Sequence, residues 1–182
     1  MVRLLDFLFA LIGLMVGLPI LLAIFAIGIF DTGSPLFVQE RVGRNKKAFK
    51  LVKFRTMRVG TISVASHLAS TDSITTLGRF LRKTKLDELP QLWNVLKGEM
   101  SLVGPRPNLY NQSELISARD ALGVYHVRPG ITGLAQVNNI DMSTPGLLAQ
   151  TDAKMIEEMS YAHYFKFIFQ TVAGKGSGDR VR

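Results

Sequence analysis

The longest uncharged stretch constrains the fold of this chain more than any other feature. From Phe7 to Phe30 no residue carries a charge, a run of 24 residues. As a straight helix this run is about 36 Å long, which exceeds the roughly 30 Å of a bilayer's hydrocarbon core. A cleaved signal peptide fits poorly, because the run is too long and no small-residue cleavage site follows it. The default interpretation is a helix that crosses the membrane once.

Two features of the run favour a different arrangement. Pro19 lies near its middle, after Gly13 and Gly17, and a proline inside a helix removes a hydrogen bond and bends the axis. Basic residues flank the run on both sides: Arg3 before it, and Arg41, Arg44, Lys46, Lys47 and Lys50 after it. Basic flanks stay in the cytoplasm, a condition met if the segment turns at Pro19 and returns through the same leaflet. From the residues alone, a spanning and a re-entrant helix are equally open.

The balance of charged and apolar residues restricts the partners. The 182 residues carry a formal net charge of +8, yet 47% of them are hydrophobic. That combination is typical of a protein on an anionic membrane surface, and no nucleic-acid reading motif is present, so nucleic acid is not expected as a partner. The absence of cysteine excludes disulfides and thiol nucleophiles. The three histidines lack metal-ligand spacing.

A pair of adjacent carboxylates marks the candidate site. Asp87 and Glu88 precede Pro90 and a run of helically spaced apolar residues, which predicts a helix that begins here and ends near Gly98. Ordinary capping of a helix N-terminus is one explanation, because negative charge is favoured there. The other is a carboxylate that acts beside an anionic substrate at a lipid surface. The neighbouring cations support it: Arg79, Arg82, Lys83 and Lys85 upstream, and Arg106 between two prolines downstream.

The remaining pattern predicts a small domain of mixed structure. Residues 41–58 are basic with apolar residues between the charges, and the period near Ala48–Phe54 is too short to separate strand from helix. Helical patterns cover residues 76–83, 108–122 and 147–172. An extended piece is expected at 36–39, and residues 127–137 are expected to hold a rigid turn that carries Arg128, followed by an extended piece. Loops are expected at 60–75 and 138–146.

Five motifs in the sequence resemble the bacterial sugar transferase family, the monotopic phosphoglycosyl transferases. They are Phe37–Gly43, Lys53–Met57, Gly78–Leu92, Gly104–Pro107 and Val127–Gln136. The resemblance runs from about Arg3 to Val172, and the length and order of the motifs make it specific. The chain is similar to the small members, which lack the extra N-terminal membrane helices of the larger ones.

The resemblance implies an α+β, mostly helical fold with three parts. Residues 1–32 would form a re-entrant membrane helix hairpin broken at Pro19. Residues 33–173 would form a small cytoplasmic, membrane-associated catalytic domain, and residues 174–182 a flexible tail. One departure affects the bend: Leu18 stands where relatives often have serine before the proline, which removes a hydroxyl that could satisfy broken backbone.

The resemblance also implies a reaction, in which a sugar-1-phosphate passes from a UDP-sugar to undecaprenyl phosphate with release of UMP. It places the protein at the cytoplasmic leaflet of the bacterial inner membrane, and we expect an acetamido-deoxy sugar. Asp87 matches the family nucleophile, and Mg²⁺ is the implied cofactor, with Asp87 and Glu88 as ligands. Glu88 would serve as a ligand or as an acid/base. The candidate phosphate-binding residues are Arg82, Arg106, Arg128 and Asp152.

Asp152 aligns with a family acid by gapless counting, but its neighbours depart from the aromatic-rich family pattern.

Two other functions remain open. A non-catalytic membrane-surface adaptor would use the apolar run and the basic face, yet it gives the Asp87–Glu88 pair no role. An inverting glycosyltransferase would release UDP in place of UMP. The oligomeric state is also open, and a homodimer is one option.

Overall fold

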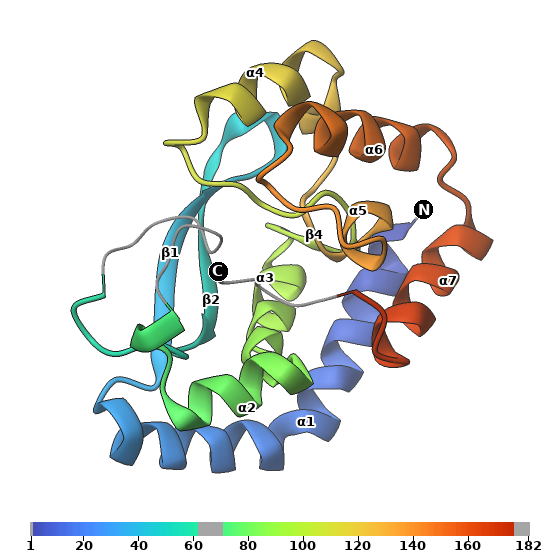
Figure 1. The fold of residues 1–182 in the computed structure, drawn as a ribbon. Helices are drawn as coiled ribbons and strands as arrows, with labels where there is room; N and C mark the ends of the chain where they lie inside the picture. The colour runs from blue at the N-terminus through green and yellow to red at the C-terminus, as the bar shows by residue number, and fades with distance from the viewer. Residues whose placement is uncertain (1, 62–70, 177–182) are drawn as a thin grey trace.

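The computed structural model describes residues 2–61 and 71–176 and is a mostly helical α+β fold, as expected (Figure 1). Its α-helices are α1 (Val2–Thr32), α2 (Thr76–Thr84), α3 (Gln91–Lys97), α4 (Ser113–Ala121), α5 (Leu134–Val137), α6 (Pro145–Glu157) and α7 (Tyr161–Val172). The strands are β1 (Leu36–Val42), β2 (Ala48–Phe54), β3 (Ser101–Val103) and β4 (Gly130–Thr132). Short 3₁₀ turns are η1 (Arg44–Lys46), η3 (Thr71–Ser73), η4 (Leu86–Glu88) and η5 (Val124–His126).

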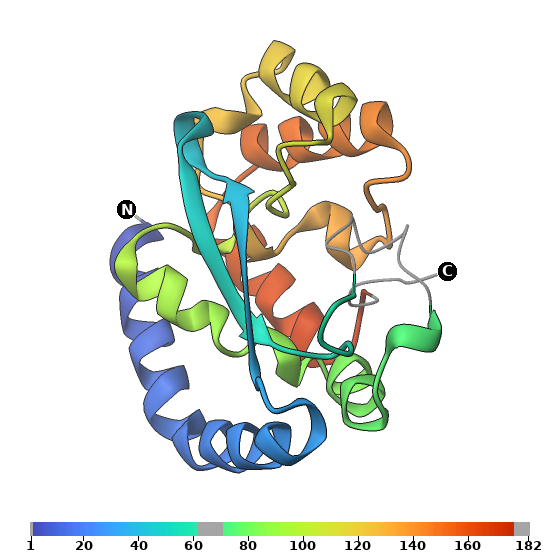
Figure 2. The ribbon, with the colours of Figure 1, turned by 90° about the vertical axis from the view of Figure 1, so that its left-hand side faces the viewer.

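The first helix, α1, is long, apolar and bent. It has 31 residues and contains Pro19. Figures 1 and 2 both show α1 changing direction part-way, so that it has two arms. A proline inside a helix accounts for such a bend, because it lacks the N–H of one helical hydrogen bond. Large apolar side chains are exposed on both arms, up to 91% at Phe30, and the helix is long and apolar enough to cross a membrane.

The beginning of α1 is nonetheless tied into the rest of the protein. Ala10 is fully buried in a core cluster that includes residues of α3 and β2. Asp6 is 3% exposed, and its Oδ1 accepts hydrogen bonds from Ser101 Oγ, Leu102 N and Tyr164 Oη, each 2.9 Å long. The first arm of α1 is therefore fixed to β3 and α7.

Strands β1 and β2 form an antiparallel hairpin that runs from the end of α1 toward α4 (Figure 2). Their register pairs Leu36 with Phe54 and Val42 with Ala48. Helix α3 is fastened to this hairpin by Asn94, whose Nδ2 donates to Lys50 O (2.7 Å) while its Oδ1 accepts from Val52 N (3.1 Å). The sequence pattern near Ala48–Phe54 did not separate strand from helix. These residues form strand β2, which positions α3.

Strands β3 and β4 form a short parallel pair with Ser101 opposite Gly130. The backbone segments around Gly104 and Gly130 are in direct contact, since a Cβ added at Gly130 would lie 2.0 Å from Gly104 N. Only glycine permits such an approach. The two proline-rich turns that carry Arg106 and Arg128 therefore start from adjacent backbone.

Two expectations for secondary structure are wrong. Residues 147–172 are not one helix, because α6 ends at Glu157 and α7 begins after Ser160. The Ser160 hydroxyl accepts a hydrogen bond from His163 N (3.2 Å), an N-cap that starts a new helix. Residues 134–137 are helical and not extended, and Ala135 of this short helix is buried in a cluster with residues of α4 and α6.

Candidate active site

The carboxylate pair lies in the turn η4, between α2 and α3. Lys85 has a positive φ of 59°, which ends α2 and redirects the chain into η4. Asp87 is 3% exposed and Glu88 is 9% exposed. Pro90 then occupies the cap position of α3. The pair therefore stands just before a helix, as the sequence predicts, with both carboxylates largely withdrawn from solvent.

Glu88 is paired with an arginine from the downstream turn. Arg106 Nη2 lies 2.6 Å from Glu88 Oε1, and the two side chains are 25% and 10% exposed. Lys85 belongs to the same electrostatic cluster. Burial lowers the pKa of Lys85, the Glu88 carboxylate opposes that shift, and the Arg106 guanidinium adds to it. Two of the residues singled out from the sequence, 18 positions apart, are thus in contact.

Two further cations lie beside Arg106, around a cavity of ≈20 Å³. They are Arg41 of β1 and Lys53 of β2, only 7% and 8% exposed, and Gln91 of α3 also lines the space. Arg41 Nη1 donates to Pro107 O (3.2 Å), which links the hairpin to the Arg106 turn. From the sequence, Arg41 was expected only as a basic flank of the apolar run, and Lys53 only as a member of a motif. Their signal was present, because each belongs to one of the family-like motifs.

Arg82 is held at the last turn of α2, directly before η4. Its Nε donates to Thr56 Oγ1 (2.9 Å), and Thr56 is 3% exposed. The helix lies against the backbone of that residue, since a Cβ added at Gly78 would be 2.0 Å from Thr56 O. The buried threonine therefore sets the position of the Arg82 guanidinium.

Arg128 lies away from the carboxylate pair. Its Nε donates to Gly98 O (2.8 Å), at the residue that follows the last turn of α3. Asp87 precedes the first turn of the same helix, so the two residues lie at opposite ends of α3. The structure brings Glu88 and Arg106 together but separates Arg128 from them.

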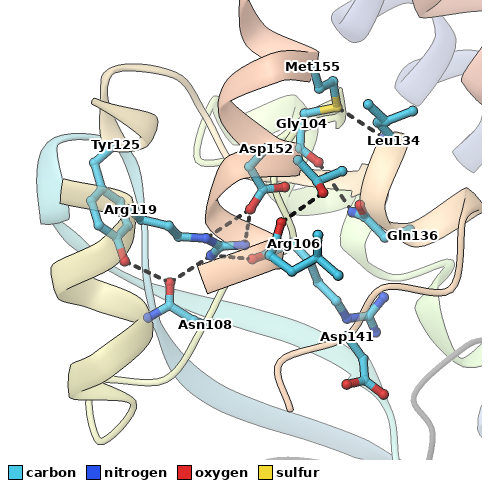
Figure 3. Close-up of polar contacts among 12 residues, drawn as sticks. Gly104, Arg106, Asn108, Arg119, Tyr125, Leu134, Gln136, Asp141, Asp152 and Met155 are labelled. Atoms are coloured by element: carbon cyan, nitrogen blue, oxygen red, sulfur yellow. Dashed lines mark hydrogen bonds and ion pairs between the residues drawn. The ribbon is translucent and has the colours of Figure 1, made fainter. Parts of the chain in front are cut away.

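Asp152 is enclosed in a buried ion pair (Figure 3). Its Oδ2 accepts from Arg119 Nε (3.0 Å) and Nη2 (2.6 Å), and the two side chains are 0% and 2% exposed. Burial raises the pKa of Asp152, and the Arg119 guanidinium opposes the shift. Arg119 Nη1 donates in turn to Arg106 O (2.8 Å) and Asn108 Oδ1 (2.9 Å). Asp152 thus acts on the Arg106 backbone through Arg119, a residue that sequence reasoning missed.

Comparison with known proteins identifies the family of this chain. The model of the family described as "Bacterial sugar transferase" matches residues 1–175. The chain belongs to the bacterial sugar transferase family. The match includes α1, the η4 carboxylates and both arginine turns, so the resemblance drawn from the motifs is confirmed.

Relatives within the bacterial sugar transferase family have more specific names. A UDP-galactose-lipid carrier transferase of Erwinia amylovora is 36% identical over 90% of this chain. A UDP-glucose:undecaprenyl-phosphate glucose-1-phosphate transferase of Caulobacter vibrioides is 40% identical over 84% of it. A Bacillus subtilis protein, provisionally named an undecaprenyl-phosphate N-acetylgalactosaminyl 1-phosphate transferase, is 47% identical over 58%. The alignments span only 39%, 61% and 60% of these relatives' own lengths.

A divalent cation in this sugar transferase would depend on the η4 carboxylates. Among residues 2–61 and 71–176, no group of three or more acidic, histidine or cysteine side chains could hold a metal by itself. Mg²⁺ does not require such a group, because it is usually bound by one or two carboxylates together with substrate phosphates and water. The adjacent Asp87 and Glu88 fit that requirement, in surroundings rich in cations that suit a phosphate.

Proposed function

We propose that this protein transfers a sugar-1-phosphate from a UDP-sugar to undecaprenyl phosphate and releases UMP, as a first membrane step of glycan or glycoconjugate assembly. The observation that carries the proposal is the buried Asp87–Glu88 pair, in which Glu88 contacts Arg106. Family membership and the printed names of the Erwinia and Caulobacter relatives support it.

The proposed reaction has two displacements at phosphorus. An Asp87 carboxylate oxygen attacks the β-phosphorus of the UDP-sugar, the bond from that phosphorus to the bridging oxygen breaks, and UMP leaves. The sugar phosphate is then held on Asp87 as an acyl phosphate. A phosphate oxygen of undecaprenyl phosphate attacks the same phosphorus, the acyl phosphate bond breaks, and the free carboxylate is restored.

Charge repulsion is the main obstacle to the first displacement, because a carboxylate approaches a diphosphate. Arg106, Arg41 and Lys53 come from three separate segments of the chain, and together they supply positive charge beside the carboxylates. Arg82 would add a guanidinium from the end of α2. Mg²⁺, held by Asp87 and Glu88, would neutralise further phosphate charge when bound. Arg106 also keeps the Glu88 carboxylate in a fixed place beside the nucleophile.

We further propose that α1 is re-entrant and that the catalytic domain lies on the cytoplasmic face of the inner membrane. The bend in α1, the Pro19 that it contains and the basic flanks on both sides support this arrangement. The chain has no cysteine, so single cysteines at Leu4→Cys and Lys47→Cys can be labelled with a membrane-impermeant maleimide. Labelling of both from the cytoplasmic side is expected, whereas protection of Leu4→Cys there would indicate a spanning helix.

The proposed sugar is an acetamido-deoxy sugar. The name of the Bacillus relative supports it, while the names of the other two relatives point to galactose and glucose. A panel of UDP-sugars with undecaprenyl phosphate and Mg²⁺ tests the choice. We expect UDP-N-acetylhexosamines to give the highest rate of UMP release, and faster turnover of UDP-glucose or UDP-galactose would overturn this part alone.

The decisive experiment compares Asp87→Asn with the wild-type protein. Loss of the nucleophile should lower UMP release by about 10³-fold or more. With radiolabelled UDP-sugar and no lipid acceptor, the wild-type protein should retain label from the sugar phosphate and Asp87→Asn should not. The matched control is Asp120→Asn, which removes the same charge from an exposed carboxylate and should behave as wild type.

The competing functions give different results in the same assay. A membrane-surface adaptor would release no nucleotide, and Asp87→Asn would leave its behaviour unchanged. A glycosyltransferase that leaves the phosphate behind would release UDP. Either outcome would contradict the proposed reaction.

A further inference from the structure

A second cavity lies at the beginning of α1, where that helix runs beside α7 (Figure 1). Its volume is ≈310 Å³, at the lower end of the range for small-molecule sites. Met155, Ile156 and Met159, at the end of α6 and just beyond it, form an apolar part of the wall. The cavity shares no lining residue with the small space beside Arg106.

Three arginines from separate parts of the chain meet in the wall of this cavity: Arg3, Arg44 and Arg128. Each is anchored by backbone carbonyls. Arg3 donates to the carbonyls of Val95 and Leu96 at the end of α3, Arg44 Nε donates to His126 O (2.9 Å), and Arg128 Nε donates to Gly98 O (2.8 Å). The anchoring fixes the guanidinium groups before any ligand arrives, which reduces the entropy lost on binding.

Positive charge outweighs negative charge in the described lining of this cavity, with three arginines against the single carboxylate of Asp6. Within residues 2–61 and 71–176, none of the three arginines forms an ion pair with a carboxylate, and the terminal nitrogens of Arg44 and Arg128 have no hydrogen-bond partner. The Asp6 carboxylate in the lining offsets one of these three charges, and its Oδ1 is held by hydrogen bonds from Ser101, Leu102 and Tyr164 and not by an arginine. The exposed His126 ring adds no negative charge. A fork of free N–H groups is the geometry that binds phosphate oxygens bidentately.

We propose that this cavity binds a phosphate group that carries an apolar or planar substituent, at a site separate from Asp87. The guanidinium groups bind the phosphate oxygens, and the methionine and isoleucine side chains pack against the substituent. Two kinds of molecule have this chemistry: the headgroup region of an anionic phospholipid, and a free nucleotide. Arg128, expected from the sequence to bind phosphate, would do so here.

The test uses the full-length protein in neutral detergent without divalent metal, and native mass spectrometry to count bound molecules. One probe is dihexanoyl phosphatidylglycerol and the other is UMP. Arg44→Gln removes one guanidinium that the carboxylate site does not use. Lys47→Gln is the matched control, since Lys47 is also exposed, lies three residues away in the sequence and does not line the cavity. Arg44→Lys keeps the charge and should lose less affinity than Arg44→Gln.

For one of the two probes, Arg44→Gln should weaken binding about tenfold, the effect of losing a charge-assisted hydrogen bond, while Lys47→Gln binds as wild type. A loss for phosphatidylglycerol alone identifies the lipid as the source, and a loss of one bound UMP identifies the nucleotide. If both probes bind Arg44→Gln as tightly as wild type, or if Lys47→Gln loses as much, the proposal is wrong. Nucleotide release is not measured, so the result does not depend on the proposed reaction.

Discussion

Two acid–guanidinium pairs with the same contact distance have different environments in this protein. Glu88–Arg106 and Asp152–Arg119 both have a nitrogen–oxygen distance of 2.6 Å. The first pair is 10% and 25% exposed, beside a second carboxylate and a cavity lined by further cations. The second is 0% and 2% exposed and enclosed by Asn108 and the backbone of Arg106. A substrate could therefore reach the Glu88–Arg106 pair, whereas the Asp152–Arg119 pair is closed to it.

The two pairs are also connected in series. Arg119 Nη1 donates to the carbonyl of Arg106, whose own guanidinium contacts Glu88. The enclosed pair therefore fixes the backbone from which the accessible pair is built. Removing the enclosed pair should damage both stability and the geometry of the site, whereas removing the accessible one should affect function alone.

The largest effect is expected for Asp152→Leu. It leaves the buried Arg119 guanidinium without a counter-charge, although Nη1 still donates to Arg106 O and Asn108 Oδ1, and the free energy of unfolding should fall by about 3–5 kcal/mol. Denaturant unfolding of the detergent-solubilised protein measures the change. The double variant Arg119→Met with Asp152→Leu removes both charges and should recover part of the loss. Equal stability of Asp152→Leu and the wild type would contradict the structural role of this pair.

Glu88→Gln should separate function from stability. We expect UMP release to fall about 10²-fold, as for loss of a group that assists by charge or proton transfer. The free energy of unfolding should change by less than about 1 kcal/mol, because the glutamine amide oxygen can still accept a hydrogen bond from Arg106, whose side chain is 25% exposed. Rates and unfolding curves from the same preparation measure both. A stability loss as large as that of Asp152→Leu would remove the distinction between the pairs.

Tyr125 extends the comparison to alkaline pH. Its hydroxyl donates to Asn108 Oδ1 (3.0 Å), and burial raises its pKa above 10.0, opposed by Arg119. The unfolded chain therefore loses this proton first, so the stabilisation is complete below pH 10.0 and is lost as the pH rises from there toward the folded-state pKa. Tyr125→Phe should cost about 1 kcal/mol at neutral pH and make the alkaline decline shallower. Parallel declines in both proteins would refute the linkage.

The smallest effect is expected at an exposed pair. Lys46 and Asp120 are 2.8 Å apart, with side chains 49% and 51% exposed. Lys46→Gln should change the free energy of unfolding by less than about 1 kcal/mol and leave UMP release unchanged. Measured beside the two other variants, it gives the baseline for an acid–base contact in water. A larger loss than that of Glu88→Gln would show that exposure does not rank these pairs.

Local signals in the sequence were sufficient for the carboxylate turn. Asp87 and Glu88 before Pro90 predicted a pair at a helix start, and the structure has it there. The contact with Arg106 was suggested only by a rigid proline turn downstream. Arg119 gave no such signal, because one arginine in a helical pattern is usually solvated. Its burial depends on packing between α4 and α6, which no local pattern specifies.

The errors along the chain also have physical causes. The break between α6 and α7 was visible in principle, since Ser160 is a good N-cap, but the apolar and aromatic residues on both sides continue a helical period. Asp6 was overlooked because it stands at the edge of the uncharged run. Its three hydrogen bonds come from residues about a hundred positions away or more, and such contacts follow from the tertiary fold.

The bonds of Asp6 have a mechanical consequence. These hydrogen bonds connect the first turns of α1 to β3 and α7. The buried Ala10 adds a packing contact with α3, the helix that follows Asp87. The first arm of α1 and the reactive turn therefore hold a fixed position relative to each other. If α1 is re-entrant as proposed, the depth at which it lies in the leaflet would set the distance between Asp87 and the lipid phosphates.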